Sequence, residues 1–182
     1  ATKMLGSEYV VPLLGVWDKP EDIDFDSLPD KFVLKTNHSG GNTGVIVCKD
    51  KSKLNKQDVI KKLNKSLKTD ISVSLREWVY KGMKKQVFAE ELLESSTGEI
   101  DDYKFYCFGG YADAVLVCVD RQIGEPKFYF FDENWQLKRY NKRGKEAPID
   151  FTLPRPENLD DMFRIARLLS KGIPHLRVDL YN

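Results

Sequence analysis

A lysine followed by a glycine-rich turn is the pattern in this sequence with the clearest chemical meaning. Residues 32–47 read Phe-Val-Leu-Lys-Thr-Asn-His-Ser-Gly-Gly-Asn-Thr-Gly-Val-Ile-Val, which predicts a strand, a small polar turn and a second strand. Glycines let backbone N–H groups converge on an anion because no Cβ blocks their approach. Lys35 adds a mobile positive charge beside them, so the pattern fits phosphate binding. The composition also fits an ordinary hairpin loop.

A nucleotide site built on this turn would differ from the P-loop. The P-loop pattern G-x-x-x-x-G-K-[ST] is not present, and a strand follows the turn where a P-loop requires a helix. A histidine in the turn fits contact with phosphate as well as it fits a catalytic role. The candidate phosphate contacts beside Lys35 are His38, Ser39, Gly40, Gly41 and Gly44.

An arginine and an aspartate lie two residues apart near the end of the sequence. Residues 175–181 alternate between apolar and polar side chains, which predicts a strand with Arg177 and Asp179 on one face. An arginine can clamp a phosphate, and an aspartate can bind a metal ion beside it. The same two residues also fit a surface ion pair worth under about 1 kcal/mol. The opposite face carries Leu176, Val178 and Leu180.

Acidic and apolar residues follow one another at the end of a predicted strand, residues 86–93. Free backbone groups at a strand edge, with apolar side chains beside them, can hold an adenine ring. The candidates are Glu90, Glu91, Leu92 and Leu93, although solvated acidic residues at a strand end fit the same letters. Asp101 and Asp102 fit turn and ligand roles equally well.

The hydrophobic periodicity predicts an α+β protein dominated by antiparallel strands. The expected strands after the hairpin are 86–93, 102–108, 112–119, 128–131, 135–140 and 175–181, with Gly109-Gly110 as a two-residue hairpin turn. The expected helices lie within 50–70, 74–80 and 158–170. Residues 18–30 are expected to form an acidic connector, and residues 138–145 an exposed basic loop.

Composition argues against several partners. The chain has 182 residues and a net charge of +1, so no field of the whole protein favours nucleic acid or an anionic membrane. Its apolar runs are of strand length, which predicts no membrane span. Cys48, Cys107 and Cys118 lie in apolar runs without C-x-x-C spacing, which predicts buried reduced thiols and a cytoplasmic location. The oligomeric state is not indicated.

The order of these segments resembles a known family. LPDKFVLKTNHSGGNTGVIVCKD, FAEELLE, DYKFYCFGG, VDR, FFDENW and PENLDDMFRIARLLSKGIPHLRVDLYN follow one another as in ATP-grasp proteins of the TupA type. Those proteins are associated with the biosynthesis of teichuronopeptide and other surface polysaccharides. The resemblance implies an ATP-grasp fold of two α+β lobes that grip ATP between them.

The resemblance also implies a role for each candidate residue. Lys35 matches the phosphate-contacting lysine, and residues 39–44 match the phosphate loop. Residues 90–93 match the strand that holds adenine, and Asp102 lies where a ribose contact is found. Arg177 matches an arginine on the transferred phosphate, and Asp179 matches the first Mg²⁺ carboxylate. The activity implied is ATP- and Mg²⁺-dependent ligation of a carboxylate to an amine through an acylphosphate, releasing ADP.

The resemblance is incomplete at the end of the chain. ATP-grasp sites continue with a strand that carries an acidic residue and an Asn, whereas this sequence stops at Asn182. We therefore expect truncation at both ends, with a connector at 1–30, a small lobe at 31–84 and an incomplete larger lobe at 85–182. The chain by itself is expected to be inactive or nearly so. A glycosyltransferase of the same pathway and a non-catalytic nucleotide-binding module are the alternatives.

Overall fold

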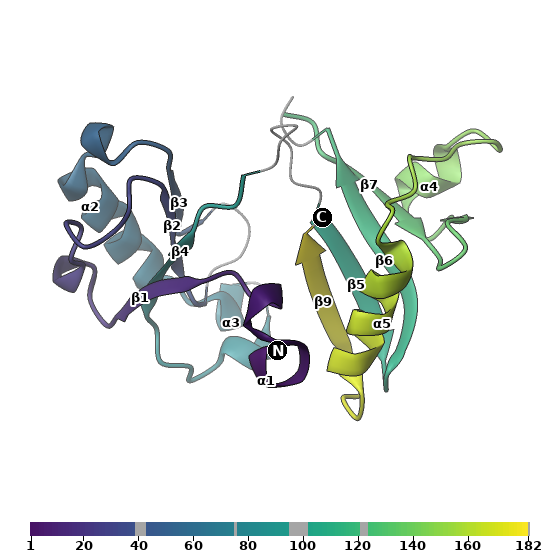
Figure 1. The fold of residues 1–182 in the computed structure, drawn as a ribbon, viewed down its shortest axis with the longest axis horizontal. Helices are drawn as coiled ribbons and strands as arrows, with labels where there is room; N and C mark the ends of the chain where they lie inside the picture. The colour runs from purple at the N-terminus through teal and green to yellow at the C-terminus, as the bar shows by residue number, and fades with distance from the viewer. Residues whose placement is uncertain (39–42, 75, 95–101, 121–123, 182) are drawn as a thin grey trace. The chain divides into compact units, whose positions relative to one another are not determined.

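The computed structural model describes residues 1–38, 43–74, 76–94, 102–120 and 124–181 (Figure 1). The chain divides into two compact units, one of residues Ser7–Leu93 and one of Ala1–Gly6 with Glu94–Asn182. The fold is α+β with two antiparallel sheets, as the sequence predicted.

The Ser7–Leu93 unit is built on a four-stranded antiparallel sheet in the order β1-β4-β2-β3. Its strands are β1 (Leu13–Trp17), β2 (Phe32–Thr36), β3 (Val45–Cys48) and β4 (Val87–Glu91). The hairpin predicted from the glycine-rich pattern is confirmed, with Phe32 opposite Cys48 and Lys35 opposite Val45. Strand β1 was not predicted, although it pairs with β4 along the edge of this sheet.

One face of this sheet is covered by helix α2 (Lys56–Leu67) (Figure 1). The helix begins at Asn55, whose side chain accepts hydrogen bonds from the backbone N–H groups of Gln57 and Asp58. Val59 and Leu63 of the helix pack with the sheet residues Phe32, Leu34, Val87 and Ala89. The lysine-rich helix predicted within residues 50–70 is therefore confirmed, with its apolar stripe on the core and its lysines outside.

Residues 18–30 do more than connect, contrary to the prediction. A 3-10 turn, η2 (Pro20–Asp22), is followed by Ile23, Phe25 and Leu28, all buried in the core under α2. The acidic residues between them dominate the composition of this segment but lie in solvent. Only the spacing of the apolar residues indicates that Ile23, Phe25 and Leu28 are buried.

The segment between α2 and β4 also differs from its prediction. Instead of one helix over 74–80, it forms α3 (Ile71–Ser74) and the 3-10 turn η4 (Trp78–Tyr80). Arg76 between them has a φ of 57°, in the left-handed region that a continuous right-handed helix does not use.

The second unit contains a five-stranded antiparallel sheet in the order β8-β7-β6-β5-β9. Its strands are β5 (Asp102–Phe108), β6 (Tyr111–Val119), β7 (Lys127–Phe131), β8 (Leu137–Lys138) and β9 (Leu176–Tyr181). The β5–β6 hairpin turns at Gly109 and Gly110, with φ values of 59° and 96°, which confirms the predicted two-residue turn. The strand predicted over 135–140 is only two residues long.

Helix α5 (Leu159–Ser170) covers one face of this sheet (Figure 1). Its apolar residues Leu159, Met162, Phe163 and Ala166 are buried, and the Phe163 ring meets Phe105 edge-on at 4.9 Å between centroids. The three cysteines are free and buried, as predicted.

The basic segment 138–145, predicted as an exposed loop, contains a short helix, α4 (Lys142–Glu146). The side chain of Asn141 accepts a hydrogen bond from the Gly144 N–H at 2.9 Å and caps it. The N-terminal residues form α1 (Thr2–Leu5) and η1 (Ser7–Tyr9), and η3 (Lys51–Lys53) precedes α2. Among the described residues, no helix is long and apolar enough to cross a membrane.

The boundary between the two units differs from the one expected from the sequence, which was between residues 84 and 85. Strand β4 pairs with β1 on one side and with β2 on the other, so residues 87–91 belong to the first sheet, and the first unit ends at Leu93. For the same reason, residues 7–30 lie inside this unit rather than before it.

Candidate functional site

The glycine-rich hairpin places Lys35 on the sheet face that α2 does not cover. Leu34 lies in the core with α2, and side chains alternate along a strand, so Val33 and Lys35 point to the opposite face. On the neighbouring strand β4, Glu90 lies on that same open face, and its carboxylate forms an ion pair with the Lys35 ammonium group. Both side chains are partly exposed. The open face thus carries a lysine at the mouth of the hairpin.

The two ends of the turn are held by backbone hydrogen bonds. The Thr36 N–H donates to the Gly44 carbonyl at 3.1 Å, and the Asn37 N–H donates to the Gln86 carbonyl at 3.1 Å. Gly44 has a φ of 73°, a conformation that favours glycine. Ser39, Gly40 and Gly41, the other predicted phosphate contacts, lie outside the described residues. Their roles stay predictions.

The side chain of His38 is used in packing against α2. The residue is 1% exposed, and its Nε2–H donates to the Ser66 carbonyl at 3.1 Å. Two residues earlier, the Thr36 hydroxyl is 2.9 Å from the Ser66 hydroxyl. The last residues before the predicted phosphate loop are therefore fastened to the C-terminal half of α2. Phosphate contact by the His38 side chain, expected from the sequence, has no support in this geometry.

We expect His38→Ala to lower the free energy of unfolding by about 2–3 kcal/mol, because it removes a buried hydrogen bond and leaves a cavity. Urea denaturation measures this loss. His175→Ala is the matched control, since the protein has two histidines and His175 is exposed. Equal stability of the two variants would contradict the anchoring role.

The predicted adenine segment begins in the centre of the sheet, not at an edge. Glu90 pairs with Val33 on one side and Leu13 on the other, and the Glu91 N–H donates to the Pro12 carbonyl at 3.1 Å. The assumption of free backbone groups at Glu90 and Glu91 is therefore wrong. Leu92 and Leu93 continue past the paired part of β4, so they are the better placed pair to present backbone groups to a base.

In the second unit, Arg177 and Asp179 lie on one face of β9, as predicted. The guanidinium donates two hydrogen bonds to the carboxylate, Nε to Oδ1 at 2.7 Å and Nη2 to Oδ2 at 2.9 Å. These bonds raise the pKa of Arg177 above its usual value, so it stays charged. Val178 is buried on the opposite face with the α5 core. The predicted alternation of this strand is confirmed.

A lysine that the sequence analysis did not single out joins this pair. Strand β5 pairs antiparallel with β9, with Lys104 opposite Asp179. The Lys104 ammonium group forms an ion pair with Asp102 and lies 3.8 Å from Asp179 Oδ2. The four side chains Asp102, Lys104, Asp179 and Arg177 form a row of alternating charge, which we call the β5–β9 charge row. Alternation along DYKFY could have placed Asp102 and Lys104 on one face, but not beside β9.

The charge row has the chemical groups for a phosphate and a cation. Arg177 offers a planar fork of donors, and Lys104 offers a mobile ammonium group. Asp179 has a partly exposed carboxylate, a hard oxygen ligand of the kind that Mg²⁺ prefers, whereas Asp102 is buried. Mg²⁺ is commonly held by one or two carboxylates plus phosphate oxygens, so Asp179 fits such an ion. Across the described ranges, no group of three or more His, Cys, Asp or Glu residues gathers into a metal cluster.

Aromatic side chains lie beside the charge row on the same face of the sheet. Tyr106, opposite Arg177 in the strand pairing, lies 5.5 Å from Phe130 between ring centroids. Phe130 in turn lies 5.6 Å from Tyr140. An apolar neighbourhood strengthens the interaction between these charges and an ionic ligand, because it excludes water.

Comparison with known proteins agrees with the family resemblance. A family model described as TupA-like ATP-grasp matches residues 2–182. Among solved structures, the chain is similar to a D-alanine–D-alanine ligase from Bacillus anthracis, with 19% identity, a TM-score of 0.46, and coverage of 98% of this chain and 49% of that chain. The chain thus spans about half the length of that ligase. No curated protein matches it. With a family match over nearly its whole length, the chain belongs to the TupA-like ATP-grasp family.

Proposed function

We propose that this chain provides the nucleotide-binding part of an ATP- and Mg²⁺-dependent ligase that joins a carboxylate to an amine and releases ADP. The observation that carries the proposal is membership of an ATP-grasp family over residues 2–182. The structure adds two sheet faces that point away from the covering helices α2 and α5, one with Lys35 beside a glycine-rich hairpin and one with the β5–β9 charge row.

Each candidate residue has a part in this proposal. Lys35 and the loop from Ser39 to Gly44 bind the phosphates, with His38 as the anchor of that loop. Leu92 and Leu93 present backbone groups to adenine, while Glu90 and Glu91 fix the strand that leads to them. Asp102 lies near the ribose. Arg177 binds the transferred phosphoryl group, and Asp179 is the ligand for Mg²⁺.

The reaction needs no side-chain nucleophile. A carboxylate oxygen of the substrate attacks the γ-phosphorus of ATP, the bond to the bridging oxygen breaks, and ADP leaves. The amine then attacks the acyl carbon, inorganic phosphate leaves, and the amine nitrogen loses a proton. Lys35 and Arg177 stabilise negative charge on the transferred group, since catalysis of phosphoryl transfer consists largely of positioning and electrostatics. Asp179 would hold Mg²⁺, which would supply further positive charge beside the phosphates.

The setting of the reaction is also part of the proposal. The family is associated with surface polysaccharide and teichuronopeptide biosynthesis, so the acid is proposed to be a small molecule or a glycan carboxylate. Reduced buried cysteines at all three positions fit a cytoplasmic site of action. Incubation of a chain that extends beyond Asn182 with ATP, Mg²⁺ and panels of acids and amines tests the proposal, because the 182-residue chain by itself is expected to be inactive or nearly so. Release of ADP that requires both an acid and an amine supports it, and UDP release from a nucleotide sugar contradicts it.

The adenine assignment gives a separate prediction. We expect Leu93→Asp to weaken ATP binding at least about tenfold, because the bound base would take the new carboxylate partly out of water. Calorimetry measures the affinity, and thermal unfolding should change little, since Leu93 is exposed. Ile173→Asp, at a similarly exposed residue of the second unit, is the control. GTP binding as tight as ATP binding would contradict the assignment, because guanine reverses the donor and acceptor at its edge.

A further inference from the structure

Three large apolar side chains of the Ser7–Leu93 unit lie in solvent close together in sequence. Val73 of α3 is 71% exposed, and Trp78 and Val79 of η4 are 66% and 81% exposed. The two short helices pack against each other, so these residues belong to one local structure. We call Val73, Trp78 and Val79 the α3–η4 patch. No role proposed above uses it.

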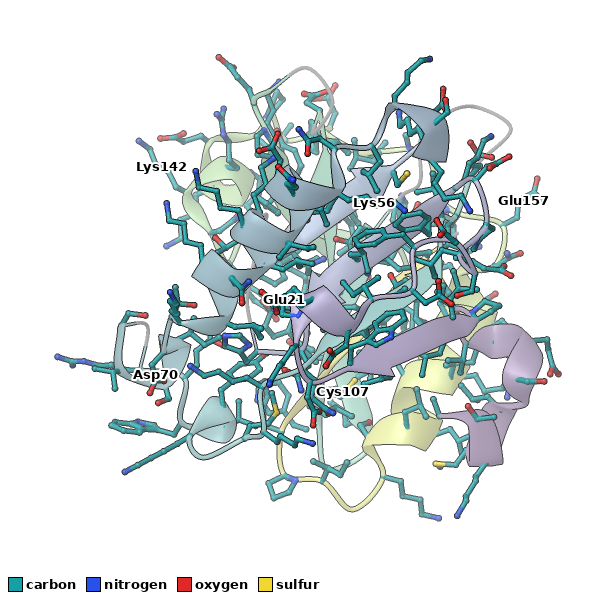
Figure 2. All side chains as sticks on the ribbon, turned by 90° about the vertical axis from the view of Figure 1, so that its left-hand side faces the viewer. Glu21, Lys56, Asp70, Cys107, Lys142 and Glu157 are labelled. Carbon is teal, nitrogen blue, oxygen red and sulfur yellow. The ribbon has the colours of Figure 1, made fainter. Side chains whose placement is uncertain are left out.

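One cation contacts this patch, and others lie near it in the sequence. The Lys81 ammonium group lies 5.7 Å from the centroid of the Trp78 ring. Lys65 and Lys68 at the end of α2 and Arg76 before η4 are exposed. Lys56, which pairs with Asp26, lies at the other end of α2 from Asp70 and is not part of this group (Figure 2). Residues 65–85, which run from the end of α2 through the patch, contain six cations against two acidic residues, a net charge of +4, whereas the whole chain carries +1.

We propose that the α3–η4 patch and the cations of residues 65–85 bind the surface of an anionic lipid bilayer. Tryptophan favours the boundary between lipid headgroups and acyl chains, and exposed aliphatic residues insert beside it. Lys and Arg add attraction to anionic headgroups. The net charge of the whole chain does not show this local positive charge, because acidic residues elsewhere in the sequence balance it.

Charge and size favour this partner over a second copy of the chain or another protein. A stable protein interface buries about 800 Å² on each side. Three side chains cannot supply that area, since even an aromatic residue buries only about 150–250 Å². A soluble polyanion would use the cations but would gain nothing from two exposed valines.

The test is flotation of the 182-residue chain with vesicles of phosphatidylcholine alone or mixed with phosphatidylglycerol. We expect binding only to the mixed vesicles, with a blue shift of tryptophan emission that Trp78→Phe removes. Val73→Ser together with Val79→Ser should reduce binding about tenfold, and Lys81→Gln about fivefold. The matched controls Ile149→Ser, at a residue 98% exposed in the second unit, and Lys142→Gln should bind as the unmodified chain does.

Four results would overturn the proposal. The first is no binding to the mixed vesicles, and the second is equal binding to vesicles of phosphatidylcholine alone. The third is binding to the mixed vesicles that heparin displaces and that the two valine substitutions do not weaken. The fourth is self-association of the chain without lipid, measured by analytical ultracentrifugation, that Val79→Ser abolishes. Because the three residues of the patch lie in solvent, their replacement should leave the circular dichroism spectrum and the unfolding midpoint unchanged, so weaker binding reports the surface and not the fold.

Discussion

In a chain that extends beyond Asn182, replacing Asp179 by Asn is expected to lower ADP formation at least about a hundredfold while leaving the fold intact. The amide has the shape of the carboxylate but neither its charge nor its affinity for Mg²⁺. It also removes one of the two hydrogen bonds that Arg177 donates to this side chain, since the amide nitrogen cannot accept. We therefore expect ATP to bind still, with an affinity that no longer increases when Mg²⁺ is added. Calorimetry with and without EDTA measures this difference independently of turnover.

Asp161→Asn is the matched control for this experiment. Asp161 is also an exposed aspartate paired with an arginine, Arg164 at 2.9 Å, but it lies on α5 away from the charge row. The control should keep the Mg²⁺ dependence of ATP binding. If Asp179→Asn kept it as well, Asp179 would not be the metal ligand, and its pair with Arg177 would be a surface contact only.

The second large effect is expected at Lys35. Lys35→Ala should weaken ATP binding by about 1.5–3 kcal/mol, roughly ten- to a hundredfold, because a charged hydrogen bond to phosphate is lost. Glu90 contributes to this loss, since its carboxylate loses its counter-ion on the open face and repels the phosphates. Calorimetry measures the affinity, and urea denaturation measures the accompanying loss of stability.

A double variant separates these two contributions. Lys35→Met with Glu90→Gln removes both charges, so stability should recover while ATP affinity stays low. Lys84→Ala, which breaks the exposed ion pair with Asp18, is the control and should change neither quantity much. Full recovery of ATP affinity in the double variant would mean that Lys35 acts only by neutralising Glu90.

The parts of the fold that could be predicted depend on local chemistry. Glycines between two apolar runs predict the hairpin around residues 32–48, and Gly109-Gly110 predicts the β5–β6 turn. The alternation of β9 places Arg177 and Asp179 on one face whatever the strand pairs with. These features need no knowledge of distant residues.

The missed features depend on contacts between distant parts of the chain. Strand β1 is a short edge strand whose pairing with β4 supplies its stability. The connector 18–30 is apolar only at the positions that α2 covers. Lys104 became a candidate only because β5 pairs with β9 in a register that puts it opposite Asp179. Sequence patterns report which face a residue takes, but not which strand lies beside it.

The position of β9 has a consequence for how this protein behaves in solution. Within the described residues, β9 is the last strand of its sheet, and an outer strand presents backbone groups that can pair with another molecule. The exposed charges of Arg177 and Asp179 lie along this strand, and charged side chains on an outer strand disfavour its pairing with another molecule. We therefore expect the residues proposed for phosphate and metal also to limit edge-to-edge association of the chain. Variants that neutralise them should be compared at low protein concentration, so that lost activity is not confused with lost solubility.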